Sequence, residues 1–536
     1  MNRKKSAIRS RLEPALQSAI KGDAATIYDK IKNTVKHTII YSIGSFVSSA
    51  FGVLLIPLYT RKLRASEYGV LALMMVTLTL VSVVLKFGLN QAFFRHYYDT
   101  EDPEHRHRIV GSTFIFLLCS TILFTAVLYW LAPHIAMRAF TGESQRPDLL
   151  RLIFLIGFFE VINIIPDSIL RAKFYSARYS GLNITAFIVQ IALICYLVYF
   201  VEASVKMVLI GRLIGVAFET AIFYVAVWRD LSLKFSFQEV RDLLAFGSPF
   251  IFSAIASTLF IMIDRFFLER YSGETEVGVY SLANNVTGAV TALAIMPFSQ
   301  VWTVMRFKVM NEEGADEYYS RVLTYIVFVS MFLALGVAAL AGNGLLLFAH
   351  RSYYLFPTIL PLLALSVVLD SASRVLNVGI TLRKRTLYGP LLTIAALLFN
   401  IALNFWLIPR YGSIGASIST LLSYAFFCII RYTVSNLFFP VHYEWRRVFM
   451  ILGIGSIIIA SFYAIDFTIA SSPRKTLLVL TGLIKACIAL MFPFALLALR
   501  FYDQRELNRI SEKWQQLVAL IKNGKREAVL LRDSRS

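Results

Sequence analysis

The chain has 536 residues, of which 57% are hydrophobic and only 16% are charged, and its mean hydropathy is +0.65. A soluble chain of this length would carry about 25% charged residues, so the composition excludes a water-soluble protein. The net charge of +20 does not indicate a nucleic-acid partner, because multi-pass membrane proteins keep basic residues beside anionic lipids. We therefore expect an all-α polytopic membrane protein.

Fourteen apolar stretches are each long enough to cross a bilayer, which takes about 20 residues. We expect these spans near 38–59, 69–91, 110–132, 149–170, 181–201, 207–227, 246–266, 277–302, 322–348, 354–377, 388–409, 412–434, 445–466 and 475–499. The first stretch follows a long polar leader and lacks a small-x-small cleavage site, so it is not a cleavable signal peptide. Because fourteen is even, both termini lie on one side of the membrane.

Lysine and arginine predict which side that is. The segments 1–37 and 500–536 hold nine basic residues each, and the loop Arg383-Lys384-Arg385 falls on the same side. Basic residues are enriched in cytoplasmic segments, so we expect both termini in the cytoplasm. The loop Thr60-Arg61-Lys62-Leu63-Arg64 is external in this topology and breaks the rule.

Both terminal segments have apolar residues at helical spacing with basic residues between them. We expect the leader 1–37 and the tail 500–536 to lie on the inner membrane surface, with a protein partner as the alternative. No loop is long enough for a soluble catalytic domain, so the chain is not expected to be an enzyme. It has no phosphate-binding loop, and its four cysteines are isolated in apolar stretches, so we expect no cofactor and no metal site.

Short motifs recur in the chain at nearly constant spacing. Glu67-Tyr68-Gly69-Val70-Leu71-Ala72-Leu73 resembles Glu276-Val277-Gly278-Val279-Tyr280-Ser281-Leu282, at an offset of 209 residues. Two weaker matches follow in the same order. An offset of six spans gives parallel repeats, whose transport site usually lies between the halves. We therefore expect two pseudo-symmetric six-helix lobes, 38–227 and 246–434, with two further helices in 445–499.

Several of these motifs resemble the bacterial polysaccharide transporters. Ile56-Pro57-Leu58-Tyr59-Thr60-Arg61 followed by Glu67-Tyr68-Gly69 resembles their first-loop signature, and Gly88-Leu89-Asn90-Gln91 fits the end of their second helix. Asp264-Arg265-Phe266-Phe267-Leu268, followed by the motif at Glu276, is the most specific match. The resemblance covers the first twelve spans, and it identifies the chain as similar to the O-antigen and lipid-linked oligosaccharide flippases of the multidrug/oligosaccharidyl-lipid/polysaccharide (MOP) superfamily.

This resemblance implies a function and a location. Such proteins carry an undecaprenyl-pyrophosphate-linked oligosaccharide, a repeat unit of O-antigen, capsule or exopolysaccharide, from the inner to the outer leaflet of the bacterial inner membrane by alternating access. The partners implied are the lipid-linked oligosaccharide and membrane lipids, with the polysaccharide polymerase and chain-length machinery as candidate protein partners. The alternative is a cation-coupled multidrug antiporter of the same superfamily, which as a rule has twelve helices.

Charged residues inside the spans are the candidate site residues. An ionised side chain at mid-membrane costs at least about 2.5–3.5 kcal/mol, so it normally faces protein or a wet cavity. Arg212 and Glu219 are seven residues apart and share one helix face, while Glu160 is a candidate proton or cation site. We expect these residues to face the substrate cavity, with structural ion pairs between neighbouring helices as the alternative.

Three further candidates and one undecided residue complete the set. Lys86 lies near the cytoplasmic end of its span, where it faces the cavity or extends to the membrane surface. Asp264 and Arg265 are adjacent and cannot share a helix face, so we expect a separate partner for each. Lys485 is at the middle of the last span, where it contacts either a lipid pyrophosphate or a partner helix.

Two acid–base pairs at i,i+4 spacing lie at the ends of predicted spans. We expect Asp167 to pair with Arg171 and Asp370 to pair with Arg374, and both pairs to be structural.

Overall fold

The computed structural model describes residues 55–347, 349–353, 356–385, 387–469, 475–504, 506–508 and 512. The predicted leader 1–37, nearly all of the predicted first span 38–59 and most of the tail 500–536 lie outside the described residues. Every secondary-structure element in the described part of the chain is helical, as the composition predicts for a membrane protein that must satisfy its backbone hydrogen bonds internally.

The elements follow one another in a simple order. They are α2 (Ala65–Leu85), α3 (Leu89–Asp99), α4 (Pro103–Ala139), η1 (Gly142–Ser144), α5 (Pro147–Ile162), α6 (Ile164–Ala172), α7 (Ser176–Tyr196), η2 (Leu197–Val201), α8 (Val205–Val227), α9 (Phe237–Met262), α10 (Asp264–Ser272), α11 (Glu274–Val290), η3 (Thr291–Ile295), α12 (Met296–Lys308), α13 (Ala315–Leu346), η4 (Arg351–Tyr353), α14 (Phe356–Leu376), α15 (Val378–Leu382), α16 (Tyr388–Phe438), α17 (Trp445–Ile469), α18 (Lys475–Leu490) and α19 (Phe492–Ala498).

Twelve helical stretches among the described residues are long and apolar enough to cross a membrane. The longest, Tyr388–Phe438, contains both predicted spans 388–409 and 412–434, with a break at Gly412, where φ is 54° and ψ is −132°. With the first predicted span almost wholly outside the described residues, this accounts for the difference from fourteen. The chain is an all-helical multi-pass membrane protein.

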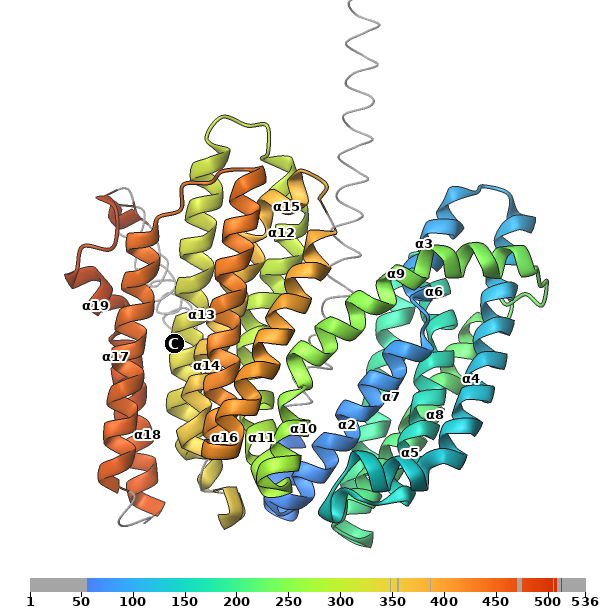
Figure 1. Cartoon of the computed structure of the whole chain (residues 1–536), viewed down its shortest axis with the longest axis horizontal. Helices are drawn as coiled ribbons and strands as arrows, with labels where there is room; N and C mark the ends of the chain where they lie inside the picture. Colours follow the sequence, from blue (N-terminus) through green and yellow to red (C-terminus); the bar gives the residue numbers. More distant parts are fainter. Residues whose placement is uncertain are drawn as a thin grey trace, which may run out of the picture.

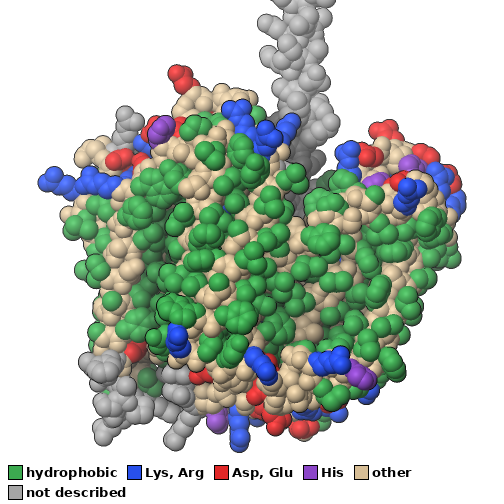
Figure 2. Space-filling view, in the orientation of Figure 1, with side chains coloured by type: hydrophobic (Ala, Val, Ile, Leu, Met, Phe, Trp, Pro, Cys, Tyr) green, Lys and Arg blue, Asp and Glu red, His purple; other side chains and the backbone are tan. Residues whose placement is uncertain are grey.

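Two groups of helices converge at one end of the molecule (Figure 1). Helices α2–α8 form the first group, which we call the N-lobe, and α10–α16 form the second, which we call the C-lobe. A wide band of hydrophobic side chains covers the outer surface, and charged side chains gather at its two ends (Figure 2). This distribution is typical of a protein embedded in a lipid bilayer, with the apolar band in the hydrocarbon and the charged ends in water.

The helix α9 connects the two lobes, and it begins earlier than the sequence predicts. Residues 237–245, assigned to a loop by hydropathy, are the first turns of α9. This half of α9 packs against α3 and α4 of the N-lobe, and its second half packs against α16 of the C-lobe. The polar character of residues 237–245 hid this helical segment from a hydropathy count.

The lobes approach most closely where α2 packs against α11. A Cβ atom added to Gly69 would lie 1.9 Å from the carbonyl oxygen of Glu274, and one added to Gly278 would lie 1.8 Å from the carbonyl oxygen of Ala65. These are the glycines of the two matching motifs, 209 residues apart, and the residues that they contact, Ala65 and Glu274, are also 209 residues apart. The two backbones can therefore cross at this distance only because both motifs carry glycine here.

Three glutamates of the C-lobe side accept hydrogen bonds at the same end of the molecule. Glu269 accepts from the backbone amide and the hydroxyl of Thr141, and Glu274 accepts from the amide of Ser144 at 3.0 Å. Glu276 accepts from the amide of Ser413 at 3.0 Å, at the Gly412 break within the C-lobe. The bonds to Glu269 and Glu274 join the loop after α4 to the C-lobe. We call this end, which the predicted topology makes external, the closed end.

The last helices are attached to α13 by polar contacts. Lys485 of α18 is 1% exposed, and its ammonium group donates to Asp466 of α17 at 2.5 Å and to Asn343 of α13 at 3.1 Å. The sequence left two partners open for Lys485, a lipid pyrophosphate and a neighbouring helix. The contacts that the structure shows are those with neighbouring helices. A charge this deeply buried requires such partners.

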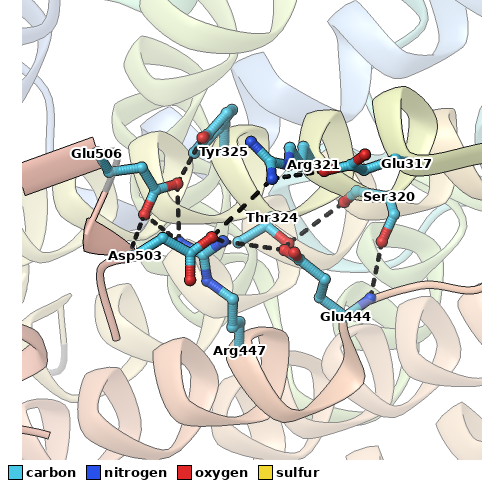
Figure 3. A network of polar contacts seen from close by, with 9 residues as sticks. All are labelled: Glu317, Ser320, Arg321, Thr324, Tyr325, Glu444, Arg447, Asp503 and Glu506. Carbon is cyan, nitrogen blue, oxygen red and sulfur yellow. Dashed lines mark hydrogen bonds and ion pairs between the residues drawn. The ribbon is translucent and has the colours of Figure 1, made fainter. Parts of the chain in front are cut away.

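A second network lies near the other end of α13 (Figure 3). The Arg447 guanidinium donates to both carboxylate oxygens of Glu506, at 2.7 and 3.0 Å, and to Glu444 at 3.1 Å. Tyr325 also donates to Glu506. Burial acts to raise the pKa of Glu506, but the bonds from Tyr325 and Arg447 outweigh it and hold this pKa below its ordinary value. The network joins the beginning of α17 and the segment after α19 to α13.

Candidate functional site

The predicted site residue Arg212 lies on α8, where α8 meets α5 and α2. Its Nη2 atom donates to Oε1 of Glu160 at 2.8 Å, and the other carboxylate oxygen of Glu160 accepts from Ser82 at 3.3 Å. The side chains of Arg212 and Glu160 are 32% and 24% exposed, so the pair is partly accessible. The sequence left two roles open for Arg212, a position facing the substrate cavity and a structural ion pair. The contact that the structure shows is the ion pair between neighbouring helices.

The other predicted N-lobe residues lie around this pair. Glu219 shares the helix of Arg212 and accepts a hydrogen bond from Asn163 at 3.2 Å. Asp167 pairs with Arg171 at 3.0 Å, which confirms the predicted i,i+4 contact. Asp167 also interacts electrostatically with Lys86. Glu219 in turn interacts electrostatically with Glu160, Asp167 and Arg212. We call this set of six charged residues the N-lobe cluster: Lys86, Glu160, Asp167, Arg171, Arg212 and Glu219.

Asp264 begins α10 and is 1% exposed. Its two carboxylate oxygens accept hydrogen bonds from Asn404 at 2.6 Å, Tyr280 at 2.6 Å and Thr420 at 2.8 Å. No ion pair reaches Asp264 within the described part of the chain, and the Oδ1 atom of Asn404 is buried without a partner. The result is a buried carboxylate held by neutral donors from α11 and α16.

Arg265 points away from Asp264, as expected for adjacent residues on a helix. Its Nε atom donates to the hydroxyl of Ser281 at 3.1 Å, its Nη1 atom donates to the carbonyl of Ile261 at 3.3 Å, and the residue is 5% exposed. The structure therefore brings Asp264 into an oxygen-rich C-lobe cluster and assigns Arg265 a packing position beside it.

The sequence did not single out a second group of arginines, which lines a cavity of about 330 Å³ in the C-lobe. Arg306 lies in the last turn of α12, Arg374 lies on α14 and Arg431 lies on the second half of α16. The expected pair of Asp370 with Arg374 is confirmed at 2.9 Å. Arg306 and Arg431 are near the ends of their spans, where basic residues are common, so no sequence signal distinguished them.

The two groups differ in what they can do chemically. The N-lobe cluster contains three basic and three acidic residues, whereas the cavity is lined by three arginines and one aspartate. A balanced cluster is self-neutralised, while a cavity with excess positive charge attracts anions. No group of three or more His, Cys, Asp or Glu residues that could hold a metal ion occurs in the described part of the chain.

Comparisons with known proteins give the fold a context. The chain is similar to the "Probable low-salt glycan biosynthesis flippase Agl15" of Haloferax volcanii, with 21% identity over 423 residues that cover 76% of this chain and 85% of that protein. Among solved structures it resembles the lipid II flippase MurJ in an inward closed conformation, with a TM-score of 0.69 and 16% identity over 85% of this chain and 98% of that one.

A second solved structure is an inward-facing multidrug resistance MATE family transporter of the MOP superfamily, with a TM-score of 0.62 and 15% identity over 76% of this chain and 96% of that one. At such identities the likeness establishes the fold, which is that of the MOP superfamily. The family model described as "Polysaccharide biosynthesis protein" matches residues 58–353, more than half of the chain. The resemblance inferred from the motifs is therefore confirmed, and the protein belongs to the polysaccharide biosynthesis protein family, a family of transporters and not of enzymes.

Proposed function

We propose that this protein is a flippase that carries a lipid-linked oligosaccharide across the membrane by alternating access. The observation that carries the proposal is the contact between α2 and α11, where the lobes cross backbone to backbone at Gly69 and Gly278. Two lobes that meet through a reversible seam at one end can separate there and close elsewhere. The family membership and the glycan flippase among the similar proteins support this cargo over a drug.

The orientation and symmetry belong to the same proposal. We take the closed end as external, so this conformation opens toward the cytoplasm, where the lipid-linked glycan is made. Of fourteen spans, twelve form two six-helix lobes related by a two-fold axis along the membrane normal between Gly69 and Gly278, and the last two are appended. The cargo is an undecaprenyl-pyrophosphate-linked repeat unit of O-antigen, capsule or exopolysaccharide in the bacterial inner membrane, handed on to a polymerase and chain-length machinery.

Asp264 supplies a place to couple transport to an ion. A buried carboxylate that accepts three hydrogen bonds and has no cationic partner in the described residues can hold a small monovalent cation. The oxygen atoms of Asp264, Asn404 and Thr420 are the hard ligands that such a cation prefers. Because these residues come from α10 and α16, an ion bound there would change how the two helices pack.

The experiment is deletion of the gene followed by complementation. We expect the deletion strain to lose its surface polysaccharide and to accumulate lipid-linked glycan at the inner leaflet, and the intact gene to reverse both. Surface glycan staining and extraction of the lipid-linked intermediate measure the two effects. Normal surface polysaccharide together with raised drug sensitivity in the deletion strain would contradict the flippase and favour the antiporter.

A further inference from the structure

The arginine-lined cavity of the C-lobe is separate from the N-lobe cluster and from Asp264. Four helices form its wall: α9, α12, α14 and α16. Its volume of about 330 Å³ is at the lower end of the range of roughly 300–1,000 Å³ that is usual for small-molecule sites. The cavity therefore has room for one chemical group of a large cargo and not for a whole oligosaccharide.

Its positive charge is only partly neutralised. Arg374 donates through two nitrogen atoms to one oxygen of Asp370, at 2.9 and 3.2 Å. Arg431 is held in place without an acid, because its Nη1 atom donates to the carbonyl and hydroxyl of Ser373 and its guanidinium stacks 3.8 Å from the ring centre of Phe427. Arg306 has no ion pair with any described residue. Two of the three arginines thus keep their charge free for a ligand.

Unpaired polar atoms concentrate around this cavity. Five buried side-chain atoms that line it find no hydrogen-bond partner among the described residues, namely Oγ of Ser299, Nε1 of Trp302, Nε of Arg306, Oδ1 of Asn377 and Nε of Arg431. Folded proteins contain few such atoms, and each one calls for an explanation. Because most of these atoms are donors and they converge on one space, a ligand rich in acceptor oxygens would satisfy the donors together, and a hydroxyl of that ligand would donate to Oδ1 of Asn377.

Aromatic side chains give the cavity a second recognition feature. Phe260 packs edge to face with both Tyr424 and Phe427, and Phe298 stacks on Trp302. Flat aromatic surfaces beside amide and hydroxyl groups suit a sugar ring, whereas forked arginine donors suit phosphate oxygens. A diphosphate joined to a sugar combines both kinds of surface in one small group.

We propose that the cavity binds the diphosphate and first sugar of the lipid-linked glycan, with Arg306 and Arg431 as the phosphate-contacting residues. This inference depends on the proposed function for the identity of the cargo. Asp370 fixes the position of Arg374 and occupies two of its guanidinium nitrogen atoms, so Arg374 adds positive charge without offering a free pair of donors. The second half of α9 lines the cavity and its first half packs on the N-lobe, so binding there acts directly on the helix that joins the lobes.

The test is binding of farnesyl diphosphate to the purified full-length protein in detergent, measured by titration calorimetry, with farnesol and inorganic pyrophosphate as reference probes. We expect farnesyl diphosphate to bind and farnesol not to bind. The double variant Arg306→Gln/Arg431→Gln should bind at least tenfold more weakly. The matched control is Arg229→Gln/Arg410→Gln, which removes two exposed arginines that stack on tryptophans, and it should bind as the unchanged protein does.

Three results would overturn the inference. The first is unchanged binding by Arg306→Gln/Arg431→Gln when its thermal unfolding matches that of the control variant. The second is binding of inorganic pyrophosphate but not of farnesyl diphosphate, which would indicate a free anion as the ligand. The third is the absence of farnesyl diphosphate binding to the unchanged protein. The proposed function fails separately, through a deletion strain that still exports its polysaccharide whatever the cavity binds.

Discussion

The two lobes treat charge inside the membrane in different ways. In the N-lobe cluster every acidic group has a basic or amide partner, and the Glu160–Arg212 pair joins α5 to α8. In the C-lobe a buried aspartate is surrounded by neutral donors, and two of the three arginines that line the cavity have no ion pair with a described residue. Paired charges fix helices relative to one another. A charge without a partner is costly to bury, and a ligand or ion of opposite charge that binds to it removes part of that cost.

This difference changes the weight given to the predicted site residues. The sequence favoured Arg212 as a cavity residue, because an unpaired arginine on an apolar helix is costly. The structure gives Arg212 an acidic partner on a neighbouring helix, and it leaves Arg306 and Arg431 without an ion pair among the described residues. We therefore expect substitutions in the C-lobe to affect transport most and substitutions in the N-lobe to affect stability most.

The largest effect is expected from Asp264→Asn. The substitution keeps the shape of the side chain but removes the charge that we propose holds a coupling cation, so polysaccharide export should fall at least tenfold while the protein still accumulates. The control is Asp242→Asn, which alters an exposed carboxylate bonded to Gln238 of the same helix. Normal export by Asp264→Asn would show that this carboxylate is structural, as in the N-lobe.

The N-lobe pair should behave in the opposite way. Arg212→Gln leaves the Glu160 carboxylate half-buried without its cation, at a cost on the order of 1–3 kcal/mol. The double variant Arg212→Gln/Glu160→Gln removes both charges and should recover most of that stability. Thermal unfolding of the three purified proteins measures the effect. Equal destabilisation by the single and double variants would mean that the two residues do not stabilise each other.

The contact between the lobes can be disturbed at a single atom. Gly278→Ala places a methyl group against the carbonyl of Ala65, so it should disfavour the closed end by about 1–3 kcal/mol. Gly288→Ala, on the same helix but with no atom within 4 Å, is the matched control. Alkylation of a cysteine introduced at Ser144, in a protein without its native cysteines, should accelerate only in Gly278→Ala. Equal rates would contradict a seam that opens here.

The smallest effect concerns the network around Arg447. Because the folded protein lowers the pKa of Glu506, this carboxylate stabilises the fold above its ordinary pKa, and that contribution disappears as the pH falls below it. We expect a loss of about 1 kcal/mol or less as the pH falls from about 5 to 3, absent in Glu506→Gln. The melting temperature of both proteins across this pH range measures it, and identical profiles would assign the pH dependence to other groups.

The fold was predictable from the sequence where one signal dominates. Hydropathy located the described spans, because each must satisfy its length and apolar content independently of its neighbours. It missed the first turns of α9, which are polar, but it divided Tyr388–Phe438 correctly into two spans, which meet at the backbone break at Gly412. The glycines of the repeated motif gave the position of the lobe contact through their spacing, although nothing in the sequence states what touches them.

The site was less predictable because burial of charge depends on pairing between distant helices. Spacing along one helix predicted Asp167–Arg171 and Asp370–Arg374 correctly. The partner of Arg212 is 52 residues away, and the three arginines of the cavity come from three helices. Arg306 and Arg431 looked like ordinary basic residues at the ends of spans, and only their convergence on one cavity gives them a role.

The most direct test compares export by two double variants in the deletion strain, with the amount of protein in the membrane measured for each. Arg306→Gln/Arg431→Gln removes the charges that have no acidic partner, and Arg212→Gln/Glu160→Gln removes a neutral pair. We predict that the first loses at least nine-tenths of surface polysaccharide at normal protein level and that the second retains most of it. Retained export in the first variant, with loss in the second at equal protein level, would contradict the assignment of cargo binding to the C-lobe.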